Sequence, residues 1–224
     1  MLKILTFIIA FTSFLTFSGF TLVPSTPVLT LQTWTTDIEK LCPGVNSVWN
    51  YSEEDTSPSL LLAKPCTTYT NALAGGTVLG MDNQRLTALG FDVKSTEHCG
   101  PASPRFTVYT AKGVYYFFGC QSGTHKDLKN DWTRIEFSNK DAKPVNGAQA
   151  WPGFGKVTVT ALELAFDEHG TTQVDNLKIN NQVITGPTKD QQVESCKNDG
   201  WLNYSYLGPF TSQQDCIDYF SKQN

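Results

Sequence analysis

Six cysteines constrain the fold of this chain more than any other feature of the sequence. Disulfides persist in oxidising compartments and are rare in the cytosol, so an even set of close cysteines predicts an exported protein braced by crosslinks. Many pairings of six cysteines exist, and we choose among them on sequence proximity alone. The pairs expected are Cys42 with Cys66, Cys99 with Cys120, and Cys196 with Cys216.

The N-terminus has the pattern of an export signal. Lys3 is the only early positive charge, and Ile4–Phe17 is an apolar run broken only by threonine and serine. Small residues follow, which places cleavage near Ser18 or Thr21. We therefore predict that residues 1–21 are a signal peptide and that the mature protein is secreted.

An uncleaved membrane anchor is the alternative interpretation of the same segment. After Lys3 the next charge is Asp37, and Ile4–Val23 reaches the length of about 20 residues that crosses a bilayer. A membrane association is expected only in that case.

Composition narrows the fold class and the partners. The net charge is −4 with no cluster of lysine or arginine, which argues against nucleic-acid binding. Charged residues make up only 17%, while there are 17 glycines and 11 prolines, a balance typical of all-β extracellular domains. The mature chain, about 200 residues long, is enough for one domain with appendages.

The residue pattern of the chain changes at Cys66, the second cysteine. Residues 22–65 carry Pro24 and Pro27 among threonines and are predicted to be an N-terminal extended segment, with a short helix only at Thr36–Leu41. Residues 66–187 instead show repeated short runs of β-branched and aromatic residues closed by turn formers. This second stretch is predicted to form a β-sandwich domain.

A hairpin is the clearest local element. Arg105–Ala111 and Val114–Cys120 flank Lys112-Gly113, and a two-residue turn there would place Tyr109 opposite Tyr116. Since side chains alternate along a strand, both faces of this hairpin are apolar. Either both faces are buried, or one aromatic face is open to a ligand. The two expected faces are Tyr109, Tyr116 and Phe118 on one side, and Phe106, Val108, Tyr115 and Phe117 on the other.

Other runs predict the remaining strands. In Val157–Phe166, Leu162, Leu164 and Phe166 share one face, as in a strand with a single core face. Further strands are expected at Leu86–Val93, Trp132–Ser138 and Val174–Ile179, with a turn at Asn180-Asn181 before Val183 and Ile184.

Several of these runs resemble a known family. The segments are GFDV from Gly90, HCGPASPRFTVYT from His98, GVYYFFGC from Gly113, WTRIEF from Trp132, LAFDE from Leu164 and VDNLKIN from Val174. Together they are similar to secreted bacterial jelly-roll modules of the carbohydrate-binding type. The resemblance implies an all-β, jelly-roll-like antiparallel sandwich, often with a structural calcium beside its last strand. It supports the fold more than the ligand, because one sandwich architecture hosts many functions.

The tail reads as a separate unit. Residues 188–195 are predicted to be a linker, and residues 196–224 contain CKNDGWLNY and PFTSQQDCIDYF. These are similar to a C-terminal motif of secreted bacterial proteins, CKxGGWxxF followed by FxxQGDCVxxV, which implies an exported accessory unit. Asp199 and Gln214 stand where that motif has glycines. The matching residues are Cys196, Lys197, Gly200, Trp201, Phe210, Gln213, Asp215 and Cys216.

A disulfide would be the main support of so short a unit. About 29 residues bury too little surface to be stable alone. A Cys196–Cys216 bridge around Trp201, Phe210 and Phe220 would contribute about 3 kcal/mol.

Metal and catalytic alternatives are weaker. His98, Cys99, Cys120 and His125 include the ligand types of a zinc site, but no CxxC or HxxxH spacing accompanies them, so the cysteines favour disulfides. No GxSxG motif is present. Carboxylate pairs for a glycosidase can be nominated from Glu163, Asp167, Glu168 and Asp175, yet any acidic chain offers such pairs. The sequence therefore predicts that the protein is not an enzyme.

Calcium is the one cofactor with a structural argument. Asp175 should share a face with Leu177 and Ile179, where a carboxylate needs a hydrogen bond or a cation. Asp167 and Asp82 are the expected co-ligands. The alternative is a carboxylate that only accepts backbone N–H groups.

The leading hypothesis is a secreted or surface-displayed, non-catalytic module that binds glycan through exposed aromatic side chains. Tyr109, Tyr116 and Trp151 are the expected ligand-binding residues, because sugar rings stack on flat aromatic faces. Trp132 begins a strand and is expected in the core. The alternative is a structural or adhesion protein of the cell envelope with no small ligand.

Overall fold

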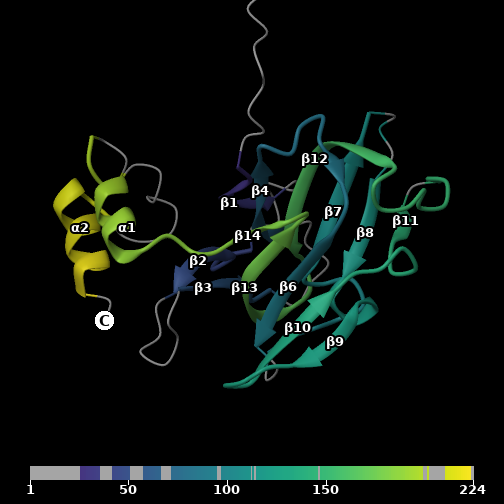
Figure 1. Cartoon of the computed structure of the whole chain (residues 1–224). Helices are drawn as coiled ribbons and strands as arrows, with labels where there is room; N and C mark the ends of the chain where they lie inside the picture. The colour runs from purple at the N-terminus through teal and green to yellow at the C-terminus, as the bar shows by residue number, and fades with distance from the viewer. Residues whose placement is uncertain are drawn as a thin grey trace, which may run out of the picture.

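The chain folds into two antiparallel β-sheets that form a sandwich, as the sequence predicts (Figure 1). The predicted signal peptide and the short helix at Thr36–Leu41 lie outside the described residues. The computed structural model describes residues 26–35, 42–50, 58–66, 72–94, 97–111, 113, 115–145, 147–198, 201 and 210–222.

Each sheet combines strands that are distant in sequence. The first has the order β1 (Val28–Thr35), β4 (Ala72–Leu79), β12 (Val157–Phe166), β7 (Arg105–Thr110), β8 (Tyr115–Gly119), β11 (Lys143–Val145), with β5 (Arg85–Leu86) paired to β12. The second has the order β2 (Asn46–Asn50), β3 (Ser59–Lys64), β13 (Gly170–Ile179), β6 (Leu89–Lys94), β10 (Trp132–Glu136), β9 (Thr124–Asp127), with β14 (Gln182–Ile184) paired to β13.

The core lies between the sheets and is rich in aromatic rings. Phe106 of the first sheet packs against Phe91 of the second, with ring centroids 5.7 Å apart. Phe137, which follows β10, packs against Phe118 at 5.5 Å. Such tilted and edge-on pairs are the favourable arrangements of aromatic rings.

Strand β12 confirms its predicted core face and adds one correction. Leu162, Leu164 and Phe166 are fully buried. The register shifts between Val159 and Ala161, so Val159 is buried too, although strict alternation placed it on the wetter face. A β-bulge inserts one residue and reverses the alternation on one side of it.

The predicted boundary between an N-terminal extended segment and the sandwich is wrong. Strands β1, β2 and β3 all precede Cys66. Strand β1 belongs to the first sheet, and β2 and β3 belong to the second. Ser47 of β2 is completely buried, and its hydroxyl donates to Gln32 O at 3.0 Å and accepts from Gly75 N at 2.6 Å in the opposite sheet. The polar loops between these strands concealed them in the sequence.

The segment predicted as a linker, residues 188–195, contains a helix. Helix α1 (Lys189–Ser195) begins with a capping box, in which Thr188 Oγ accepts from Gln191 N and the Gln191 side chain accepts from Thr188 N. Helix α2 (Gln213–Lys222) packs on α1, and the pair lies beside the sandwich (Figure 1). Gln214 lies inside α2, so no glycine is needed at that position.

All three predicted disulfides are present. They join Cys42 to Cys66, Cys99 to Cys120, and Cys196 to Cys216. In the tail, Cys196, Cys216 and Phe220 form a small buried core with Trp201 and Phe210 packed against it. Among the described residues no helix is both long and apolar enough to cross a membrane.

Candidate ligand-binding face

The register of the β7–β8 hairpin decides which aromatic side chains face outward. Tyr109 pairs with Tyr115, not with Tyr116. The turn is longer than two residues, since Gly113 takes a positive φ of 67° and its N–H donates to Thr110 O at 2.9 Å. A slip of one residue exchanges the faces of a strand. The expected role of Tyr116 as an exposed ligand-binding residue is therefore wrong, and its side chain is buried in the core.

Three other rings form a continuous surface on the outer side of the first sheet. We call Tyr109, Tyr115 and Phe117 the outer aromatic patch. Each is partly exposed. The centroids of Tyr109 and Tyr115 are 5.7 Å apart, as are those of Tyr115 and Phe117, and neighbouring rings are tilted by 37° and 44°.

A carboxylate lies against one end of the patch. Glu163 of β12 accepts a hydrogen bond from the Tyr109 hydroxyl at 2.9 Å. Burial raises the pKa of Tyr109 well above its ordinary value, and the hydrogen bond to Glu163 and the negative charge of Glu163 raise it further. The Tyr109 hydroxyl therefore stays protonated throughout the physiological pH range. Its hydrogen bond to Glu163 holds the ring in place.

A buried guanidinium supports the other end. The Arg105 guanidinium carbon lies 4.2 Å from the centroid of the Phe117 ring, a cation–π contact. Arg105 also forms an ion pair with Asp167 at 2.7 Å and donates to Ala102 O at 3.0 Å. These contacts fix the guanidinium, so the Phe117 ring has a rigid neighbour.

Polar side chains continue the surface beyond Glu163. Thr77 of β4 is opposite Glu163 in the ladder, and its hydroxyl donates to Gln32 Oε1 of β1 at 3.2 Å. Flat apolar rings beside a carboxylate, a hydroxyl and an amide can bind a ligand that has both C–H faces and hydroxyl groups. Carbohydrates have this combination of surfaces.

Trp151 lies on a loop, as expected, but not beside the patch. Its ring packs edge-on against Tyr116 at 4.9 Å and Phe118 at 5.2 Å, which are core residues of β8. Its Nε1 donates to Asn139 Oδ1 at 3.3 Å. The structure therefore places Trp151 over the core and does not bring it together with Tyr109.

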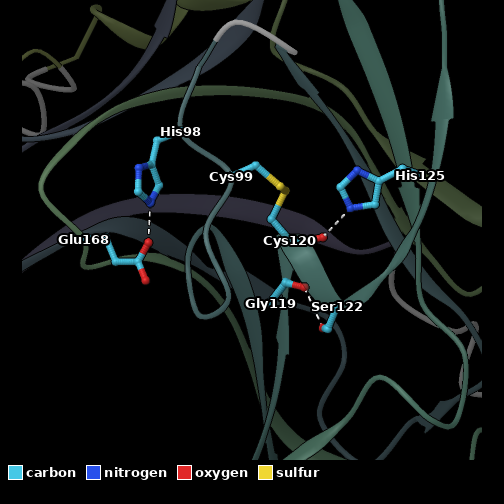
Figure 2. Close-up of a disulfide and its surroundings, with 7 residues drawn as sticks. All are labelled: His98, Cys99, Gly119, Cys120, Ser122, His125 and Glu168. Atoms are coloured by element: carbon cyan, nitrogen blue, oxygen red, sulfur yellow. Dashed lines mark hydrogen bonds and ion pairs between the residues drawn. A yellow bond between two sulfur atoms is a disulfide. The ribbon is translucent and has the colours of Figure 1, made fainter.

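The residues considered for zinc have other partners. Cys99 and Cys120 are bonded to each other, so neither offers a free thiolate. His98 pairs with Glu168 on one side of this disulfide, and His125 lies on the other side with Nε2 3.1 Å from Cys120 O (Figure 2).

The aspartates expected to bind calcium are not brought together. Asp175 Oδ1 accepts from Asn176 N at 2.7 Å, as in the alternative of a carboxylate bound to backbone N–H groups. Asp167 is paired with Arg105, and Asp82 Oδ2 accepts from the Asn83 side chain at 3.2 Å. Within the part of the chain that the structure describes, no group of three or more histidine, cysteine, aspartate or glutamate side chains could hold a metal ion.

No protein-family model and no curated protein matches the chain. Among solved structures, the family 11 carbohydrate-binding module of the cellulosomal cellulase Lic26A-Cel5E of Clostridium thermocellum is similar, with 15% sequence identity and a TM-score of 0.42. The match covers 68% of this chain and 88% of that module.

Proposed function

We propose that this protein is a non-catalytic module that binds glycans on the outer aromatic patch. The observation that carries the proposal is the arrangement of three contiguous, partly exposed rings beside hydrogen-bonding side chains. Sugar rings bury C–H surface on aromatic faces, while their hydroxyls remain free to bond with polar groups at the edge. Glu163, Thr77 and Gln32 supply such groups.

The three rings of the outer aromatic patch are not needed to fill the sandwich core. The inner side of the same hairpin already supplies Phe106, Tyr116 and Phe118 to the sandwich core. The outer rings add apolar surface on the opposite side of the sheet, where contiguous apolar area marks binding sites more often than chance.

We place this binding outside the cytosol. Three disulfides are typical of proteins that mature in an oxidising compartment. A signal peptide at residues 1–21 would deliver the chain there, and N-terminal sequencing of the secreted protein would test its cleavage.

Affinity electrophoresis in gels that contain soluble polysaccharides tests the proposal. We expect at least one of glucan, xylan, mannan, galactan or a uronic polymer to retard the protein, and Tyr115→Ala to abolish the retardation. Tyr219→Ala is the matched control, because Tyr219 is a tyrosine 45% exposed on helix α2, away from the patch. Retardation that survives in Tyr115→Ala, or a wild-type protein that no glycan retards, would contradict the proposal. If no glycan retards the wild-type protein and the protein is found attached to the cell envelope, a structural or adhesion role is favoured instead.

A further inference from the structure

We propose that Glu163 makes the outer aromatic patch select neutral glycans over acidic ones. This inference rests on the proposed function and adds the charge class of the ligand. Glu163 lies on β12 next to Tyr109, and its Oε2 is the atom that accepts from the tyrosine hydroxyl. No described side chain donates to its Oε1, so that oxygen can accept from a ligand hydroxyl.

The negative charge of Glu163 is not neutralised within the patch. Among the described residues no lysine, arginine or histidine forms an ion pair with Glu163. Arg105 is the cation beside the rings, and its charge is balanced by Asp167 at 2.7 Å. The pKa of Tyr109 is raised first by burial, and then by the hydrogen bond to Glu163 and the negative charge of Glu163.

A second cation at the far edge is too distant to compensate. Lys143 of β11 is in register with Phe117, which is in register with Thr107 and then with Glu163, so three strand spacings separate the lysine from the glutamate. At about 4.8 Å per strand this is about 14 Å. The Debye length at physiological ionic strength is about 8 Å, so solvent ions screen most of their interaction.

These charges decide between two classes of hydroxyl-rich ligand. A neutral sugar can donate a hydroxyl proton to the Glu163 carboxylate, and hydrogen bonds to a charged acceptor are the stronger kind. A uronic sugar in the same position brings a second carboxylate against the first. Like charges facing each other across an interface suppress the wrong partner. The patch should therefore discriminate most strongly when the carboxylate of the ligand lies beside Tyr109.

The test compares matched ligands by isothermal titration. Each pair is a neutral oligosaccharide and its uronic counterpart of equal length and the same linkage: β-linked glucan with glucuronan, and β-linked mannan with polymannuronate. The readout is the ratio of the neutral to the uronic affinity within a pair. Glu163→Gln removes the charge and keeps one oxygen that can accept from the Tyr109 hydroxyl, while an NH2 group replaces the other carboxylate oxygen. Asp190→Asn is the control, because it removes an equal charge from an exposed position on helix α1.

We expect the wild-type protein to prefer the neutral member and Glu163→Gln to reduce the ratio by about tenfold, near the low end of the Coulomb repulsion between like charges at a protein surface. Asp190→Asn should leave the ratio unchanged. Raising the salt from about 0.01 M to about 1 M shortens the Debye length from about 30 Å to about 3 Å and should narrow the wild-type ratio.

Two results would overturn the inference, and they are distinguishable from failure of the proposed function. A wild-type protein that binds uronic chains as tightly as neutral ones, or a ratio that Glu163→Gln does not change, refutes the role of Glu163 while glycan binding stands. Absence of binding to both members of every pair, together with no retardation by any polysaccharide in the affinity gels, refutes glycan binding and the selectivity with it.

Discussion

Replacing either of two adjacent phenylalanines with alanine should have very different consequences. Phe118 points into the core, where it is fully buried and lies 5.5 Å from Phe137, 5.2 Å from Trp151 and 5.5 Å from Phe154 between ring centroids. Phe117 points outward and is partly exposed beside Arg105. The comparison tests the register of the hairpin, on which the outer aromatic patch depends.

The magnitudes follow from burial and from these contacts. Phe118→Ala removes a fully buried ring and leaves a cavity, which lowers the free energy of unfolding by about 3–5 kcal/mol. Phe117→Ala loses part of one ring face and one cation–π contact, which together contribute about 1–2 kcal/mol. We therefore expect a difference of at least about 1 kcal/mol between the two variants, with Phe118→Ala the less stable.

Urea unfolding of the oxidised protein measures both values. Tryptophan fluorescence is a suitable probe because Trp151 contacts Phe118. A shift in the midpoint at constant slope reports stability itself. If Phe118→Ala does not fold, Phe118→Leu should still be less stable than wild type by about 1–2 kcal/mol. Equal losses for the two alanine variants, or a larger loss for Phe117→Ala, would refute the register and the identity of the patch.

Three further predictions concern the tail, the sheet packing and the patch. Replacing Cys196 and Cys216 with serine should destabilise the helical tail by about 3 kcal/mol and leave the sandwich intact, and faster amide exchange confined to α1 and α2 would show this. Gly75→Ala should cost about 1–3 kcal/mol, because a Cβ there would lie 1.9 Å from a backbone oxygen of β12, and an unchanged melting temperature would contradict it. The fold raises the pKa of Tyr109, so protonated Tyr109 contributes to the free energy of unfolding. This contribution is fully present at pH values below the ordinary tyrosine pKa of about 10, and it is lost as the pH rises towards the pKa of Tyr109 in the folded protein. Glu163→Gln should lower the pKa of Tyr109, and tyrosinate absorbance that titrates identically in both proteins would show the reasoning to be wrong.

The sequence determined the features that depend on local spacing. Each cysteine pair lies about 20 to 25 residues apart in the chain, and each pair predicted by proximity is a disulfide. Val157–Phe166 is a strand with the bounds that its alternation predicts. The all-β class follows from many such runs, because hydrophobic periodicity reflects which side of a strand is buried.

Tertiary structure decided the features in which a small local difference has a large consequence. A turn longer by one residue moved Tyr116 into the core and Tyr115 to the outer face. The sequence alone identifies Gly113 as a turn residue. A glycine with positive φ occurs in hairpin turns of several lengths, however, so it does not fix the register of the strands.

Long-range contacts also assigned roles that no local pattern carries. The polar N-terminal segment contributes strands because β3 pairs with β13, more than a hundred residues later in the chain. Glu163 gains its place beside Tyr109 only when β12 pairs with β7. Side-chain alternation is encoded in neighbouring residues, whereas the partner of a strand is set by the burial that the whole sandwich achieves. The sequence alone therefore determined the class of fold and its crosslinks, and the tertiary structure decided which side chains form the outer aromatic patch.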